Sequence, residues 1–225
     1  MAVARVPERA LARLRPEAAR VHTDAAGSGR RFARAGGLNG AFPATMAWHW
    51  AAGAEALELF RPAAEAIRRK LGRQYELIGA SFVIADGGCA QEEARFHLDF
   101  GPPAIPHQAA VTALLPLHPP RFPEQEGNLE YRPWNDGKSV AVHRYRAGEA
   151  AVFHGKLAHR TQPFSASAFA AERTPAGEAS LHGLRVLASF SFAQVPREDA
   201  PWKPALEQVM AGYGAPLLPP LGPGT

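Results

Sequence analysis

Apolar residues recur at helical spacing in the first third of the chain. In the ranges 8–21 and 44–72 they fall every three or four positions, which places them on one side of a helix. We therefore expect a short helix over the first range and a longer helical stretch over the second. Pro62 interrupts the longer stretch. We expect it to begin a second helix, because the first turn of a helix needs no N–H from that position.

Three aromatic rings fall together inside the longer stretch, at Trp48, His49 and Trp50. On a helix, consecutive side chains point about 100° apart, so these three rings would not share a face. We therefore interpret them as packing residues and not as a stacking platform for a ligand.

The hydrophobic period shortens to two after Gly72, which is typical of strands with one buried face. Strand-like runs follow, separated by clusters of glycine, proline and asparagine. The runs cover residues 75–88, 94–101, 109–120, 127–134, 139–155, 157–164 and 184–194. Short strands that follow helices predict a mainly β fold, a sandwich or a barrel with flanking helices.

The two ends of the chain differ in composition from its middle. Residues 1–35 carry eight arginines and three acidic residues, whereas the rest of the chain has a net charge of −1. We divide the chain into a basic N-terminal arm over 1–40, a barrel domain with covering helices over 41–200, and a Pro/Gly-rich tail over 201–225. An arginine-rich arm can bind nucleic acid, but we interpret this one as a solvated helix with a loop.

The cysteine content and the hydropathy limit where the protein can work. A single cysteine, Cys89, excludes an intrachain disulfide and a cysteine-rich zinc site. It also favours a reducing compartment, so we expect a cytoplasmic protein. No apolar run is long enough to span a bilayer, so we expect no membrane association.

The run 94–101, ARFHLDFG, carries the first candidate chemistry. On a strand, His97 and Asp99 point to one side, and the apolar residues between them point to the other. We expect the apolar set to pack on the helices of 44–72; it consists of Phe96, Leu98 and Phe100. An imidazole and a carboxylate supply two of the three ligands in the two-histidine, one-carboxylate triad that binds Fe(II). Taken alone, the pair is equally compatible with a buried hydrogen-bonded couple.

A third ligand has to come from a distant strand that folds back onto this one. The segment AVFHGKLAHRTQPF offers two histidines, His154 and His159, either of which can face a barrel interior. Spacing alone does not decide between them.

The last strand-like run carries an arginine on a polar face. Arg185, Leu187, Ser189 and Ser191 alternate with the apolar residues of the other face. A buried arginine is costly without a partner, and its planar guanidinium suits a carboxylate held by two parallel hydrogen bonds. The chain therefore presents His-x-Asp, then a histidine, then an arginine.

This order resembles that of the Fe(II)/2-oxoglutarate-dependent oxygenases, most nearly the phytanoyl-CoA-hydroxylase-like group. The stretch GEAAVFHGKLAHRTQP, residues 148–163, resembles the strand, turn and strand that carry the distal histidine in that group. EGNLEYRPW, residues 126–134, resembles its Asn-Gly segment, although Gly127 and Asn128 stand in the reverse order. The resemblance covers roughly residues 75–195.

The resemblance implies a double-stranded β-helix, a jelly-roll or cupin-like barrel whose larger sheet is covered by the helices of 44–72. It implies that Fe(II) is held by His97, Asp99 and His159, which are then the catalytic centre. The 5-carboxylate of 2-oxoglutarate would pair with Arg185. With O₂, such an enzyme would hydroxylate a small molecule or a protein side chain and release succinate and CO₂.

Two features depart from the group's pattern. The group often has serine or threonine two residues after the arginine, as a second partner for the 5-carboxylate, and here Leu187 stands there. We expect Ser189 or Thr112 to take that role. Residues 165–183 form an insertion between the distal histidine and Arg185. It contains Arg173, and we prefer Arg185 because it lies in a strand.

Two other classes of function stay open. A cupin-like metal-dependent dioxygenase or isomerase that does not use 2-oxoglutarate would share the barrel. Such sites usually carry more histidines near the first ligand than the run RFHLDF does. A non-catalytic binding module on the same barrel would lack a ligand, and none is missing from this sequence.

A nucleic-acid substrate is disfavoured by the last strand. The nucleic-acid demethylases of this superfamily carry a second arginine six residues after the first, where this chain has Ser191. The chain outside the basic arm is also slightly acidic, which disfavours a groove that follows phosphates. We therefore expect a small-molecule or protein side-chain substrate.

Overall fold

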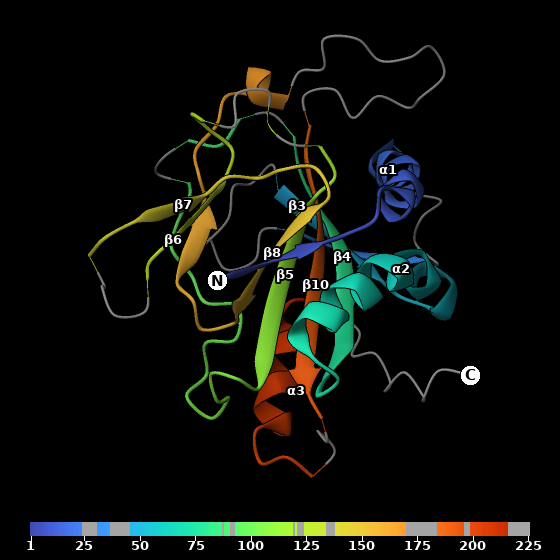
Figure 1. Ribbon diagram of the computed structural model, residues 1–225, viewed down its shortest axis with the longest axis vertical. Coiled ribbons are helices and arrows are strands. Elements are labelled where there is room, and N and C mark those ends of the chain that lie inside the picture. The colour runs from blue at the N-terminus through green and yellow to red at the C-terminus, as the bar shows by residue number, and fades with distance from the viewer. Residues whose placement is uncertain are drawn as a thin grey trace.

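The computed structural model of the chain contains two antiparallel sheets, with two helices covering the larger one (Figure 1). The structure describes residues 1–23, 31–36, 46–86, 88–90, 93–118, 120, 124–133, 138–169, 184–195 and 199–215. The larger sheet contains, in spatial order, β1 (Ala2–Arg5), β8 (Glu149–His154), β5 (Ala110–Pro116), β10 (Leu184–Gln194), β4 (Tyr75–Asp86), β3 (Met46–Ala51) and β2 (Phe32–Gly36). The smaller sheet contains β7 (Ala141–His143), β6 (Leu129–Tyr131) and β9 (His159–Thr161).

The connections between these strands form a double-stranded β-helix, the fold that the resemblance implies. After β4 the chain crosses to the smaller sheet at His97, which forms an isolated antiparallel bridge with His159. It returns to the larger sheet as β5, crosses again for β6 and β7, returns as β8, crosses for β9 and ends in β10. The alternation between sheets encloses a space that both sheets line. The strands β1, β2 and β3 lengthen the larger sheet at its two edges.

The outer face of the larger sheet is covered by α1 (Glu8–Thr23) and α2 (Ala54–Leu71), which lie together on one side of it in Figure 1. Strand alternation turns Phe82 of β4 and Phe190 of β10 towards these helices, where both are fully buried. Phe60 of α2 meets both rings, at centroid distances of 4.8 and 5.8 Å. This aromatic cluster joins helix and sheet through burial of large apolar surfaces.

The helical stretch predicted for 44–72 is wrong in its first part. Residues 46–51 form β3, which pairs with β2 and β4 and is buried on both faces. A strand covered on both faces shows no polar alternation, so its sequence does not distinguish it from a buried helix. Pro62 also does not begin a new helix, since α2 continues through it. The lost hydrogen bond there is offset by the burial of Phe60 and Ile67.

The outward packing predicted for Phe96, Leu98 and Phe100 on the helices is also wrong. Their segment joins the smaller sheet, whereas α1 and α2 cover the larger one. Phe100 is buried in the core between the two sheets, and Leu98 is 41% exposed. Phe96 lies under the guanidinium groups of Arg132 and Arg160, at 4.2 and 4.6 Å from its ring centroid.

Both chain ends contribute to the packed structure. Residues 2–5 pair with β8, and α1 buries Leu11 and Leu14 on the side that the sequence predicts. Near the other end, α3 (Lys203–Gly212) buries Leu206 and Met210. The proposed boundaries at residues 40 and 200 stay predictions, and residues 216–225 of the tail lie outside the described residues. Among the described helices, none has the length and apolarity to cross a membrane.

Candidate metal and cofactor site

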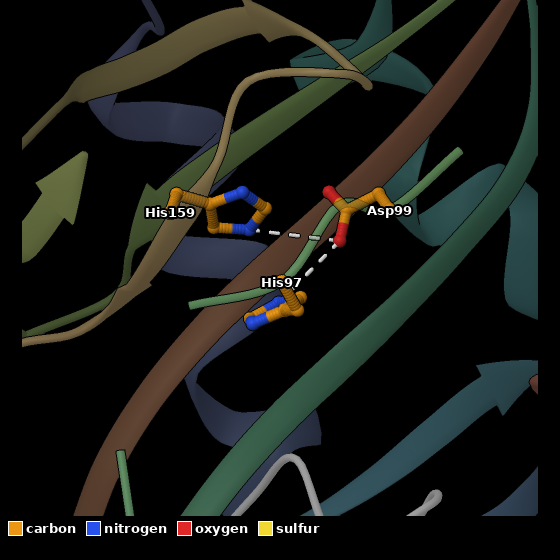
Figure 2. Close-up of side chains that lie close together, drawn as sticks. All are labelled: His97, Asp99 and His159. Carbon is orange, nitrogen blue, oxygen red and sulfur yellow. Dashed lines mark ion pairs between the residues drawn. The ribbon is translucent and has the colours of Figure 1, made fainter. Parts of the chain in front are cut away.

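Three metal-ligating side chains meet in the space between the sheets. His97 and His159 exchange two backbone hydrogen bonds, of 3.0 and 3.1 Å, which bring their side chains to one side of the bridge. Asp99 follows two residues after His97. Its Oδ1 lies 3.7 Å from Nε2 of His97 and 3.5 Å from Nε2 of His159, as the dashed lines in Figure 2 mark. One potential ligand atom from each residue therefore lies within 4.8 Å of the others.

Backbone carbonyl groups orient both imidazoles. Nδ1 of His97 lies 3.1 Å from the carbonyl oxygen of Arg95, and Nδ1 of His159 lies 2.9 Å from that of Leu157. A carbonyl oxygen only accepts, so each Nδ1 carries the proton and each Nε2 presents a lone pair. Burial, and then the neighbouring His159, lower the pKa of His97 to about 4, so that imidazole is neutral at pH 7.

Two hydroxyl groups fix Asp99. Thr112 of β5 donates from Oγ1 to Oδ2 of the carboxylate at 2.6 Å, which leaves Oδ1 facing the histidines. Tyr213, just beyond α3, donates from its hydroxyl to the backbone oxygen of Asp99 at 3.0 Å. Burial raises the pKa of Tyr213, so this donor keeps its proton. The carboxylate is thus held in one orientation before any metal binds.

A buried cation occupies the opposite end of the same cavity. Arg185, at the start of β10, is only 2% exposed, and its Nε donates to the carbonyl oxygen of Gly127 at 3.3 Å. Its guanidinium carbon lies 5.7 Å from the ring centroid of Tyr145. Burial lowers the pKa of Arg185, yet an arginine stays protonated in proteins. In the described part of the chain, no carboxylate forms an ion pair with it.

All six site residues singled out from the sequence line one cavity; they are His97, Asp99, His159, Arg185, Ser189 and Thr112. Thr112 does not lie beside the arginine, however. It pairs with Ser191 in the sheet register, six residues from Arg185, which corresponds to about 20 Å along an extended strand. The hydroxyl of Thr112 is also donated to Asp99. Its position therefore suits the metal end and not the 5-carboxylate of a cofactor.

The structure separates the alternative residues from this group. His154 does not join the triad; its ring contacts that of His107 edge to face, at a centroid distance of 5.7 Å. His159 is therefore the histidine that the fold brings to His97 and Asp99. Arg173 lies outside the described residues.

Sequence reasoning missed part of the cavity lining. Trp48 and Trp50 both line the cavity because β3 is a strand, on which residues two apart share a face. Because β3 is buried on both faces, no alternation of polar and apolar residues in MAWHWA marks them. Tyr213 also lines the cavity, and no local pattern near it indicates that its helix folds back to the site.

Comparison with known proteins shows a shared fold. No protein-family model matches the chain, and no curated protein matches it. Among solved structures, AviO1 from Streptomyces viridochromogenes Tue57 superposes with a TM-score of 0.56 at 14% identity, covering 88% of this chain and 90% of that one. The non-heme alpha ketoglutarate dependent epimerase SnoN gives 0.54 at 15% identity, over 85% of this chain and 76% of SnoN.

A hydroxylase is also among these similar structures. A prolyl-4-hydroxylase from Pseudomonas putida superposes with a TM-score of 0.51 at 19% identity, over 82% of this chain and 87% of that one. A second structure of SnoN holds Fe3+, alpha ketoglutarate and nogalamycin RO. Identities this low establish the fold alone, since one fold can host many functions.

Proposed function

We propose that this protein is an Fe(II)- and 2-oxoglutarate-dependent oxygenase that hydroxylates a small molecule. The observation that carries the proposal is one cavity with a His97, Asp99 and His159 triad at one end and a buried arginine at the other. Two imidazoles and one carboxylate are the donor set that suits Fe(II) and leaves coordination positions open. The fold shared with SnoN and with the prolyl-4-hydroxylase adds support.

The ligand atoms of the triad are already oriented for a divalent metal ion before the ion binds. Both Nε2 atoms present lone pairs, and Oδ1 of Asp99 faces them at less than 4 Å. Without a metal ion, the Asp99 carboxylate lies between two imidazoles, and neither Nε2 atom donates a hydrogen bond to it. A metal held by His97, Asp99 and His159 would satisfy all three groups at once.

The arginine is suited to an anionic co-substrate. A buried charge without a counter-charge is unfavourable, and a guanidinium binds a carboxylate through two parallel hydrogen bonds. We propose that Arg185 binds the 5-carboxylate of 2-oxoglutarate. Leu129 and Leu187 line the space between Arg185 and the triad, and their apolar surfaces would exclude water from the chain of the co-substrate.

The roles of the protein groups follow from this placement. The oxidising power would come from O₂ and 2-oxoglutarate at the iron, with succinate and CO₂ as by-products. The chain itself orients the ligands: Thr112 holds Asp99, and two carbonyl groups hold the imidazoles. Arg185 fixes the far end of the co-substrate, and Ser189, between Arg185 and the triad, is the remaining candidate for a second hydroxyl partner.

Anaerobic titration of the purified apo-protein with Fe(II) and then 2-oxoglutarate tests the proposal. We expect the weak visible charge-transfer band of the iron and 2-oxoglutarate pair in wild type and its loss in Asp99→Ala. A band would justify a substrate screen by succinate release, in which a hydroxylated product and not an epimer is expected. Metal binding without a band would instead favour a cupin-like enzyme that does not use 2-oxoglutarate, and no metal binding would favour a non-catalytic binding module.

A further inference from the structure

Aromatic side chains form one wall of the cavity. Trp48 and Trp50 of β3 both line it, and so does Tyr213 beyond α3. The ring centroids of Trp50 and Tyr213 lie 6.4 Å apart, with the planes tilted by 32°. The tyrosine hydroxyl meets the backbone of Asp99, so the aromatic wall extends from β3 to the triad.

The floor between this aromatic wall and the triad carries small side chains, those of Ser189 and Ser191 on β10. In the sheet register Trp50 lies opposite Ser81, Ser81 opposite Ser189, and Ser189 opposite Leu114. Neighbouring strands are about 4.8 Å apart, so three strand spacings put β3 about 14 Å from β5. The strand β5 carries Thr112, which holds the triad carboxylate. The small side chains of Ser189 and Ser191, on β10 between them, leave room above the floor for a flat group.

Nε1 of Trp50, an atom of the aromatic wall, is buried without a hydrogen-bond partner in the described part of the chain. Oγ of Ser81, on the neighbouring strand β4, is also buried without a partner, but Ser81 is not among the described residues that line the cavity. Trp50 is 4% exposed, and Ser81 is fully buried. A buried donor without an acceptor is unfavourable, so an oxygen atom of a bound molecule is the natural partner for the indole N–H of Trp50.

Charge is confined to the other parts of the cavity. Among the described lining residues, the charged side chains are Asp99 and Arg185, and both belong to the proposed metal and co-substrate sites. The wall and floor offer no counter-charge. A substrate with an acid or an ammonium group beside Trp50 would therefore bury that charge unpaired, which is strongly unfavourable.

We infer that the wall and floor bind an uncharged small molecule that carries a flat ring with a hydroxyl or carbonyl oxygen. The ring would lie against Trp48 and Trp50, and its oxygen would accept a hydrogen bond from the indole N–H of Trp50. Peptide side chains with charges are excluded as substrates by the same argument. The inference rests on the proposed function, because it assigns the substrate side of the same cavity.

The experiment uses the full chain loaded with Zn(II) and 2-oxoglutarate and three probes of known chemistry. Ligand-observed saturation-transfer NMR would compare the binding of 2-naphthol, 2-naphthoate and cyclohexanol. We expect 2-naphthol to bind at least about tenfold more tightly than either the acid or the saturated alcohol. Equal affinity for the three probes, or a preference for the acid, would overturn the inference.

Variants of Trp50 separate the ring from its N–H group. Trp50→Leu is expected to weaken 2-naphthol binding by about tenfold, because the stacked ring is lost. Trp50→Phe keeps a ring and removes the donor, so a smaller loss of about threefold is expected. Trp202→Phe is the matched control, a buried tryptophan that is not among the described lining residues. If both Trp50 variants bind 2-naphthol as well as wild type does, the subsite assignment is wrong. If Trp50→Leu does not fold, the comparison of Trp50→Phe with wild type still tests the assignment.

The iron titration distinguishes a failure here from a failure of the proposed function. If the charge-transfer band forms but 2-naphthol shows no preference, the function stands and the substrate class is rejected. If 2-naphthol binds through Trp50 but no band forms, the aromatic subsite stands and the oxygenase proposal is rejected.

Discussion

The two faces of the larger sheet are built from the same strands and have opposite characters. On the outer face, Phe82, Phe190 and their neighbours form an aromatic core with α2. On the inner face, Ser81 and Ser189 replace large apolar groups, and Arg185 lies buried among them. A strand alternates its side chains, so one sequence can hold a stabilising face and a reactive face one residue apart.

Because the two faces differ in this way, we expect one to determine the stability of the fold and the other to determine ligand binding. Burial of large apolar surface on the outer face contributes most to folding. The inner face buries an arginine and unpartnered hydroxyl and indole groups, which are unfavourable unless a ligand satisfies them. We therefore expect outer-face substitutions to change the free energy of unfolding and inner-face substitutions to change ligand affinity.

The largest expected effect is on the outer face. Phe190→Ala removes a fully buried ring that contacts Phe60, and we expect it to lower the free energy of unfolding by about 3–5 kcal/mol. Ser191→Ala, the next residue on the inner face, is the matched control and should cost well under about 1 kcal/mol. Urea denaturation of both variants measures the contrast, and equal losses would show that the two faces are not distinct.

The next effect is on metal affinity at the inner face. Thr112→Val removes the hydroxyl that holds Oδ2 of Asp99 and keeps the side-chain shape. We expect metal affinity to fall by about 10- to 100-fold, since loss of such an orienting hydrogen bond has that effect. Thr112→Ser should restore the affinity. Competitive titration with Zn(II) measures it, and an unchanged affinity in Thr112→Val would remove Thr112 from the site.

The smallest effect is a pH dependence that comes from the outer face. His49 pairs with Phe82 across the strands, and burial, then Arg34 and His22, lower its pKa to about 4. Above pH 6.5 the histidine is neutral in both the folded and the unfolded state, so its titration does not affect stability. As the pH falls from 6.5 towards 4, the unfolded state takes up a proton that the folded state does not.

This titration predicts a loss of stability in acid. At pH 5 the contribution of His49 amounts to at most about 2 kcal/mol relative to pH 7.5. His49→Gln should therefore reduce the difference in unfolding free energy between pH 7.5 and pH 5, as measured by urea denaturation at each pH. An identical pH dependence in the variant would mean that His49 does not titrate in this way.

Sequence patterns predicted the fold where polar and apolar residues alternate. The long runs that became β4 and β10 have clear periods, and the double-stranded β-helix follows from the resemblance and the strand order. The strand β3 was missed because both of its faces are buried, which removes the polar alternation. Its two tryptophans were consequently assigned to packing, although they line the cavity.

The candidate site was predictable in residue type and only partly in geometry. The sequence indicated His97 and Asp99 as a pair, because their spacing on a strand places them on one side. The backbone bridge between His97 and His159 selects His159 over His154, and a bridge between distant segments leaves no mark in local sequence. The contacts of Thr112 and Tyr213 with Asp99 depend in the same way on how distant strands and α3 pack.

The most direct test of the central claim is calorimetric titration of 2-oxoglutarate into the Mn(II)-loaded protein. It compares wild type with Arg185→Met and with Arg61→Met, a control on the outer helix α2 where the arginine pairs with Glu58. We expect wild type and Arg61→Met to bind 2-oxoglutarate equally and Arg185→Met to lose at least about 30-fold in affinity, since a buried charge pair loses one partner. If Arg185→Met binds 2-oxoglutarate as tightly as wild type does, the buried arginine is structural and the assignment of the inner face to this co-substrate is wrong.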